Sequence, residues 1–133
     1  MAADSKKTIV VDASAVLCAL LGDGQIPSKI KSALDDYAKN NLDLVAPTLL
    51  KTEVGNALKS ATLQKRMTAS TATSLYEKFL ELPIKYLEEI NFLKILKVSL
   101  DKKLSFYDAT YLHLAQSLKL ELLTLDNKLN QAS

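Results

Sequence analysis

Four acidic side chains that lie far apart in the chain could together bind a divalent metal ion; they are Asp12, Glu53, Asp108 and Asp126. Carboxylate oxygens and water are the ligands that Mg²⁺ and Mn²⁺ prefer. An ion held in this way activates water and stabilises the charge that develops on a phosphate during hydrolysis. If the fold brings the four acids together, the chemistry that they predict is metal-assisted hydrolysis of a phosphodiester.

Two of these acids come at the ends of predicted strands. The apolar residues 8–11 and 120–125 indicate short buried strands, and Asp12 and Asp126 follow them. In an open α/β sheet, ligands bind outside the carboxyl ends of the parallel strands. Asp is also common in turns and at helix starts, so each residue taken alone has a purely structural explanation. The repetition of the pattern at two strands favours a shared site.

The other two acids lie on predicted helices. Glu53 borders an apolar helix face, with Leu50 three residues before it and Ala57 four residues after it. A carboxylate directed at a core needs a partner or a metal, whereas a surface glutamate would simply pair with lysines. Asp108 completes a capping-box pattern with Ser105, so it either caps a helix or points from the helix start into the crevice. Both explanations stay open for each residue.

The composition is that of an ordinary globular protein and excludes only a few structural features. The chain has 133 residues, of which 48% are hydrophobic, and a net charge of +2, which fits one domain covering residues 1–133. Only 6% of the residues are aromatic, so we expect no stacking platform for single-stranded RNA. Cys18 is the only cysteine, which excludes an intramolecular disulfide and fits the reducing cytoplasm. No apolar run reaches the ~18 residues of a membrane span.

Strand and helix patterns alternate along the chain. We expect strands at 8–11, 42–46, 84–87 and 120–125, and helices at 15–21, 27–40, 47–61, 68–82, 91–102 and 105–118. This order predicts an α/β fold with three layers, α/β/α, around a central parallel sheet of four or five strands. We expect residues 1–7 to form a loose N-terminal segment, and the short stretch after Asp126 leaves little room for a further element.

Four segments in this order resemble those of PIN-domain ribonucleases of the VapC toxin class; they are residues 10–14, 46–58, 107–111 and 123–126. The resemblance implies that the four acids surround Mg²⁺ or Mn²⁺, with Ser14 and Thr124 as auxiliary polar groups. It further implies an RNA substrate, a homodimer and inhibition by an antitoxin protein. The expected function is therefore a metal-dependent endoribonuclease that is the toxin of a toxin–antitoxin pair.

Two other functions stay open on the sequence alone. The chain could be a housekeeping PIN-domain nuclease that processes RNA, or a binding module for RNA or protein without catalysis. We interpret His113, Tyr107 and Tyr111 as packing or surface residues of one helix. We also expect partly exposed apolar residues beside Glu53 to form a groove for an amphipathic partner; they are Leu17, Leu20, Leu50, Val54 and Leu58.

Overall fold

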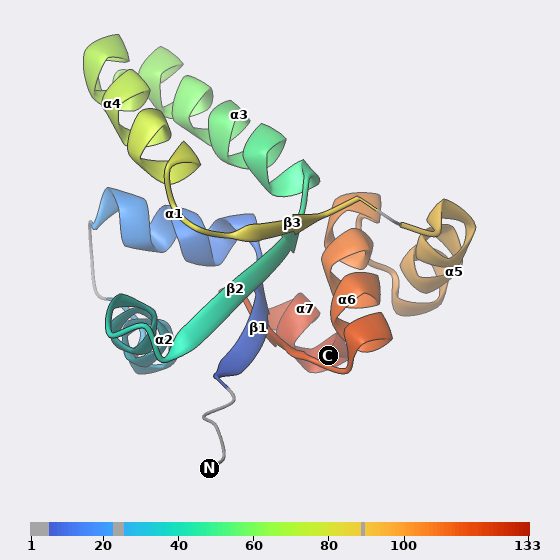
Figure 1. The fold of residues 1–133 in the computed structure, drawn as a ribbon. Helices are drawn as coiled ribbons and strands as arrows, with labels where there is room; N and C mark the ends of the chain where they lie inside the picture. Colours follow the sequence, from blue (N-terminus) through green and yellow to red (C-terminus); the bar gives the residue numbers. More distant parts are fainter. Residues whose placement is uncertain (1–5, 23–25, 89) are drawn as a thin grey trace.

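A parallel β-sheet lies at the centre of the protein, as a computed structural model shows for residues 6–22, 26–88 and 90–133 (Figure 1). Its strands have the order β3-β2-β1-β4 and are all parallel. They are β1 (Lys7–Val11), β2 (Leu42–Pro47), β3 (Lys85–Leu87) and β4 (Glu121–Leu123). Val10 of β1 is in register with Val45 of β2 and with Leu122 of β4. The predicted parallel sheet is confirmed, with four strands in the described part of the chain.

Helices cover both faces of the sheet, which confirms the three-layer α/β/α architecture (Figure 1). The helices are α1 (Ala13–Leu21), α2 (Ser28–Ala38), α3 (Leu49–Leu63), α4 (Ala69–Leu80), α5 (Phe92–Lys102), α6 (Phe106–Leu118) and α7 (Asn127–Ala132). Helices α1 and α2 lie on one side, α5 to α7 lie on the other, and α3 and α4 project together from one end. Helix α6 contacts β1, β2 and β4 and so closes one face of the sheet.

The central position of β1 explains its sequence. Ile9, Val10 and Val11 are all buried, because helices cover the strand on both faces. Helix α3 presents a stripe of buried residues at every fourth position, Leu50, Val54 and Leu58. These three side chains belong to the core, so the expectation that they line an exposed groove beside Glu53 is wrong.

Several predicted boundaries differ from the structure. Lys7 already belongs to β1, so the loose segment does not extend to that residue, and residues 1–5 lie outside the described part. Pro47 ends β2 instead of opening α3. A further helix, α7, follows Asp126 where we expected little room for one, because Asp126 itself caps that helix. Helix α1 ends at Leu21, as predicted, and it is capped by Gly22, whose φ of 60° is readily adopted by glycine. Among the described residues, no helix is long and apolar enough to cross a membrane.

Candidate active site

Asp12 lies at the carboxyl end of the central strand and forms the most buried part of the acidic site. Its side chain is 4% exposed and caps α1, with Oδ1 accepting the backbone N–H of Ala15 at 3.0 Å. The Ser14 hydroxyl also donates to Oδ1, at 2.7 Å, and the Thr124 hydroxyl donates to Oδ2. Three donors therefore hold one buried carboxylate in a single orientation.

The same two hydroxyl groups tie the segment after β4 to the start of α1. The Leu125 backbone N–H donates to Ser14 Oγ at 2.9 Å, and the Asp126 backbone N–H donates to Thr124 Oγ1 at 3.0 Å. This network places Asp126 beside Asp12 although the two residues are far apart in sequence. The residues Ser14 and Thr124, predicted as auxiliary polar groups, thus contact Asp12 directly.

Asp126 also has the structural role that the sequence left open. Its side chain accepts the backbone N–H of Leu129 at 2.8 Å and caps α7. The residue is exposed, in contrast to Asp12. One oxygen of each of these two aspartates therefore caps a helix, and this role is compatible with a second role at the shared site.

Glu53 reaches the site from the second turn of α3, where it is half-buried. The hydroxyl of Tyr111 donates to Glu53 Oε1 at 2.6 Å. Tyr111 is 1% exposed, so the interpretation of this residue as a packing residue is confirmed but incomplete. The helical spacing between Asp108 and Tyr111 places both on one side of α6, and this spacing was the sequence signal that could have revealed the contact.

Asp108 lies in the first turn of α6 and is half-buried. The helix is capped by Ser105, whose hydroxyl accepts the Asp108 backbone N–H at 3.0 Å. The capping role that the sequence allowed for Asp108 thus belongs to Ser105. The Asp108 carboxylate lies near Asp12 and Asp126, whose charges act on it.

Burial and mutual repulsion raise the pKa of three of the acids. For Asp12, burial raises the pKa most, its hydrogen bonds lower it, and the charge of Asp126 adds to the rise. For Glu53, burial raises the pKa, the Tyr111 hydrogen bond lowers it, and Asp108 and Asp12 raise it again. For Asp108, burial and then the charge of Asp126 raise the pKa. The fold therefore gathers the four predicted acids within electrostatic reach of one another.

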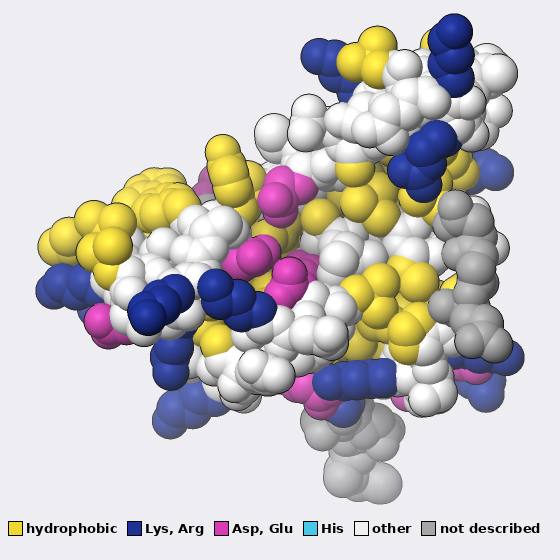
Figure 2. Space-filling view, turned by 180° about the vertical axis from the view of Figure 1, so that it is seen from behind, with side chains coloured by type: hydrophobic (Ala, Val, Ile, Leu, Met, Phe, Trp, Pro, Cys, Tyr) yellow, Lys and Arg dark blue, Asp and Glu magenta, His cyan; other side chains and the backbone are white. Residues whose placement is uncertain are grey.

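Figure 2 shows acidic side chains gathered near the middle of one face, bordered by apolar side chains, with lysines nearby. In the described ranges, no group of three or more acidic, histidine or cysteine side chains is arranged to hold a metal ion by itself. Mg²⁺ commonly keeps several waters and is bound by only one or two carboxylates. A hydrated ion therefore fits this donor set, and its charge would offset the repulsion that raises the three pKa values.

His113, the only histidine, lies away from the acids on another side of α6. Its ring is half-buried, and burial, followed by the charge of Lys94, lowers its pKa. Ser117 Oγ lies 3.4 Å from His113 Nε2. This position agrees with the interpretation of His113 as a surface or packing residue of α6.

Comparisons with known proteins point to one family. A family model described as PIN domain matches residues 9–133. Ribonuclease VapC1 of Mycobacterium tuberculosis is 33% identical over 128 residues, which cover 92% of this chain and 89% of that protein. Ribonuclease VapC9 of the same organism is 31% identical over 123 residues, which cover 92% of this chain and 88% of that protein.

Two solved structures share the fold. PAE2754 from Pyrobaculum aerophilum has a TM-score of 0.74 and 28% identity, covering 96% of this chain and 80% of that one. VapC20 of Mycobacterium tuberculosis, described as a Sarcin-Ricin loop cleaving toxin, has a TM-score of 0.62 and covers 94% of this chain and 95% of that one. At 16% identity, this second likeness shows the fold alone.

Proposed function

Because the chain belongs to the PIN domain family, within its VapC class, we propose that it is a Mg²⁺- or Mn²⁺-dependent endoribonuclease and the toxin of a toxin–antitoxin pair. The observation that carries this proposal is the gathering of four acids from four separate segments at the carboxyl end of the sheet. A protein that used these residues only as helix caps would not need to place their charges against one another.

Asp12, Glu53, Asp108 and Asp126 are the residues that would hold the metal ion. When bound, a divalent ion would supply activation of water and stabilisation of charge on the scissile phosphate. Hydrogen bonds orient two of these carboxylates: Ser14 and Thr124 donate to Asp12, and Tyr111 donates to Glu53. The hydroxyl donors also favour the ionised form of both carboxylates, which is the form that binds a cation.

Cleavage of RNA by the purified chain tests the proposal. We expect cleavage of an oligoribonucleotide with Mg²⁺ or Mn²⁺, none with EDTA, and recovery when Mn²⁺ is added back. A matching oligodeoxyribonucleotide serves as a substrate control. Absence of cleavage with either metal would favour the alternative of a non-catalytic binding module. Neutralisation of the activity by the product of the adjacent open reading frame would separate a toxin from a housekeeping RNA-processing nuclease.

The homodimer is part of the same proposal, and an exposed apolar stripe on α5 supports it. Leu93, Leu96 and Leu100 are between 44% and 69% exposed and share one side of this helix. A contiguous apolar surface of this kind is typical of a protein interface. We expect Leu96→Asp to shift the protein from dimer to monomer in analytical ultracentrifugation, whereas Leu63→Asp, at a residue 72% exposed on α3, should leave the mass unchanged. The cytoplasm, which the lone cysteine fits, is the location that we propose.

A further inference from the structure

Two adjoining hollows lie along α6, and we call them together the α6 groove. Its first part has a volume of about 390 Å³ and lies between the first turns of α3 and α6, with Phe92 at its edge. Its second part has a volume of about 590 Å³ and lies between β3 and the middle of α6. Thr48, Ile90 and Thr110 line both parts, so the two parts adjoin.

The first part of the α6 groove is lined by residues that neighbour two of the acids along the chain. Thr52 and Tyr107 line it, and each directly precedes one of the acids, Glu53 and Asp108. A polymer whose phosphate lies at the acids could therefore continue into the groove. Tyr111 does not line the groove; its hydroxyl donates to Glu53 Oε1.

Exposed aromatic rings form one wall of this first part. Tyr107 is 57% exposed and Phe106 is 39% exposed, although both lie next to the buried core of α6. Phe106 stacks on Phe92, with ring centroids 6.4 Å apart and an interplanar angle of 12°. The low aromatic content led us to expect no stacking platform, but the fold concentrates three of these rings at one place beside Asp108. Exposed rings of this kind stack on nucleic acid bases regardless of sequence.

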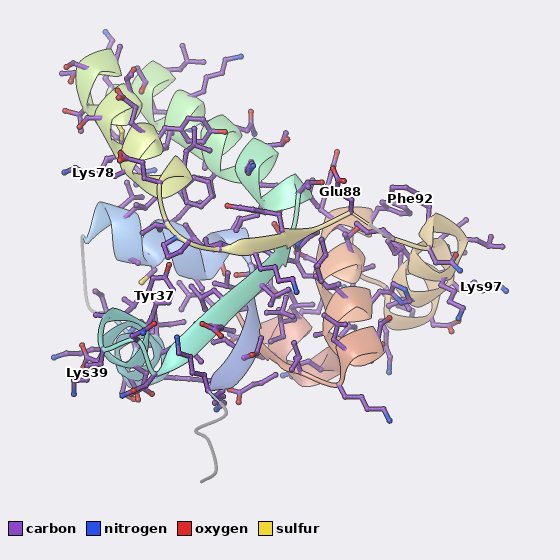
Figure 3. All side chains as sticks on the ribbon, in the orientation of Figure 1. Tyr37, Lys39, Lys78, Glu88, Phe92 and Lys97 are labelled. Carbon is purple, nitrogen blue, oxygen red and sulfur yellow. The ribbon has the colours of Figure 1, made fainter. Side chains whose placement is uncertain are left out.

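The second part of the α6 groove combines apolar walls with a few polar groups. Lys51 Nζ lies 4.4 Å from the ring centroid of Tyr86, and within the described ranges no carboxylate lies within ion-pair distance of this lysine. His113 and Ser117 stand on the opposite wall. An acidic residue, Glu88, also lines this part, at the segment that leads from β3 toward Phe92 (Figure 3). A pocket that combines apolar side chains with placed polar groups is typical of a ligand site.

We propose that the α6 groove holds the nucleotides next to the scissile phosphate, with one base stacked on Tyr107 and Phe106 and the next base in the second part of the groove, beside His113. Lys51 then contacts the phosphate between these two nucleotides, since no carboxylate among the described residues forms an ion pair with it. This inference rests on the proposed endoribonuclease function and adds to it the residues that position the substrate. Stacking requires unpaired bases, so the groove selects single-stranded segments.

Binding of RNA to a protein disabled in cleavage tests the groove. In an Asp12→Asn background, fluorescence anisotropy measures the Kd for a labelled, unpaired oligoribonucleotide. We expect Tyr107→Ala to raise this Kd at least about fivefold, the lower end of the effect of removing one stacked base. Lys51→Gln should also raise the Kd and should reduce its dependence on salt concentration. Matched controls on exposed residues of α3, Leu63→Ala and Lys59→Gln, should change the Kd less than about twofold.

Three outcomes would contradict the proposal that the α6 groove binds RNA. Equal Kd values for groove and control variants would show that RNA does not enter it, even if the unmodified chain cleaves RNA. Equal affinity for a duplex of the same sequence would contradict the stacking of unpaired bases. Loss of binding together with a change in sedimentation would show that the groove is a protein interface. Failure of the unmodified chain to cleave RNA would instead overturn the proposed function, while the Kd values would still report on the groove.

Discussion

The hydroxyl of Tyr111 on α6 donates to Oε1 of Glu53 on α3 across 2.6 Å, from a side chain that is 1% exposed. This bond links two helices that are far apart in sequence, and it fixes one acid of the site by a residue of the core. A hydrogen bond to a charged group contributes more than one between neutral groups, about 1.5–3 kcal/mol. The orientation of Glu53 therefore depends on the packing of α6.

Tyr111→Phe removes this hydroxyl and keeps the ring. We expect the affinity for Mn²⁺, measured by electron paramagnetic resonance of free Mn²⁺, to fall by about tenfold or more, the lower end of the loss of a charged hydrogen bond. The melting temperature without metal should fall as well, because the half-buried Glu53 carboxylate loses its hydrogen-bond donor, while the circular dichroism spectrum stays unchanged because the packing of the ring is retained. Tyr37→Phe is the control, since its buried hydroxyl has no hydrogen-bond partner among the described residues. Equal Mn²⁺ affinity in both variants would argue against a positioning role for Tyr111.

Asp12→Asn should abolish most of the RNA cleavage and leave the fold intact. The amide oxygen of Asn can still cap α1 by accepting from Ala15, and the Thr124 hydroxyl can turn to accept from the amide. The lost charge, however, would weaken the hold on the metal. We expect a decrease in the cleavage rate by about two orders of magnitude or more, with an unchanged circular dichroism spectrum. Asp43→Asn, at an exposed residue of β2, is the control, and near-normal cleavage by Asp12→Asn would contradict the site.

The stability of the metal-free protein should fall as the pH rises. In the unfolded chain, Asp12 and Asp108 ionise near 3.8 and Glu53 near 4.5, whereas burial raises all three pKa values in the folded state. The folded state thus binds more protons than the unfolded chain. The free energy of unfolding therefore decreases as the pH rises above the unfolded pKa values and through the higher folded pKa values. Urea unfolding in EDTA at several pH values measures this decline, and Asp12→Asn should make it shallower.

One exposed ion pair opposes this trend and needs its own control. Hydrogen bonding to Lys7, at 3.0 Å, lowers the pKa of Glu121, so its contribution to stability is lost as the pH falls. Exposed pairs contribute little. We therefore expect Glu121→Gln to leave the decline at higher pH unchanged. A stability that rises steadily from pH 4 to pH 7 in EDTA would contradict the repulsion among the acids.

Mn²⁺ should raise the melting temperature of the unmodified chain by mass action, since binding to the folded state alone stabilises it. The shift should be smaller for Asp126→Asn, which removes one charge and keeps a good capping residue for α7. In EDTA this variant should be as stable as the unmodified chain or more so, because one repelling charge is gone. Asp126→Ala also removes the cap and should cost about 0.5–2 kcal/mol in either buffer. If Asp126→Asn and Asp126→Ala lost the same stability in both buffers, Asp126 would have only a structural role.

The sequence by itself determined the elements and the residue types that they carry. A strand buried on both faces needs an unbroken apolar run, and a parallel sheet needs helical crossovers, so residues 8–11 and the alternating pattern predicted the fold. The same apolar runs predicted that Asp12 and Asp126 lie at the carboxyl ends of strands. Family resemblance then connected Glu53 and Asp108 to them.

Only the tertiary structure decided which side chains meet. The contact of Tyr111 with Glu53, the three donors around Asp12 and the exposure of Tyr107 depend on the packing of α6 against α3 and the sheet. The burial of Leu50 depends on the same packing, whereas its spacing along α3 reported only that it belongs to an apolar face. Periodicity along the chain says which side of a helix is apolar, but not which other element covers that side and which part stays open to a ligand.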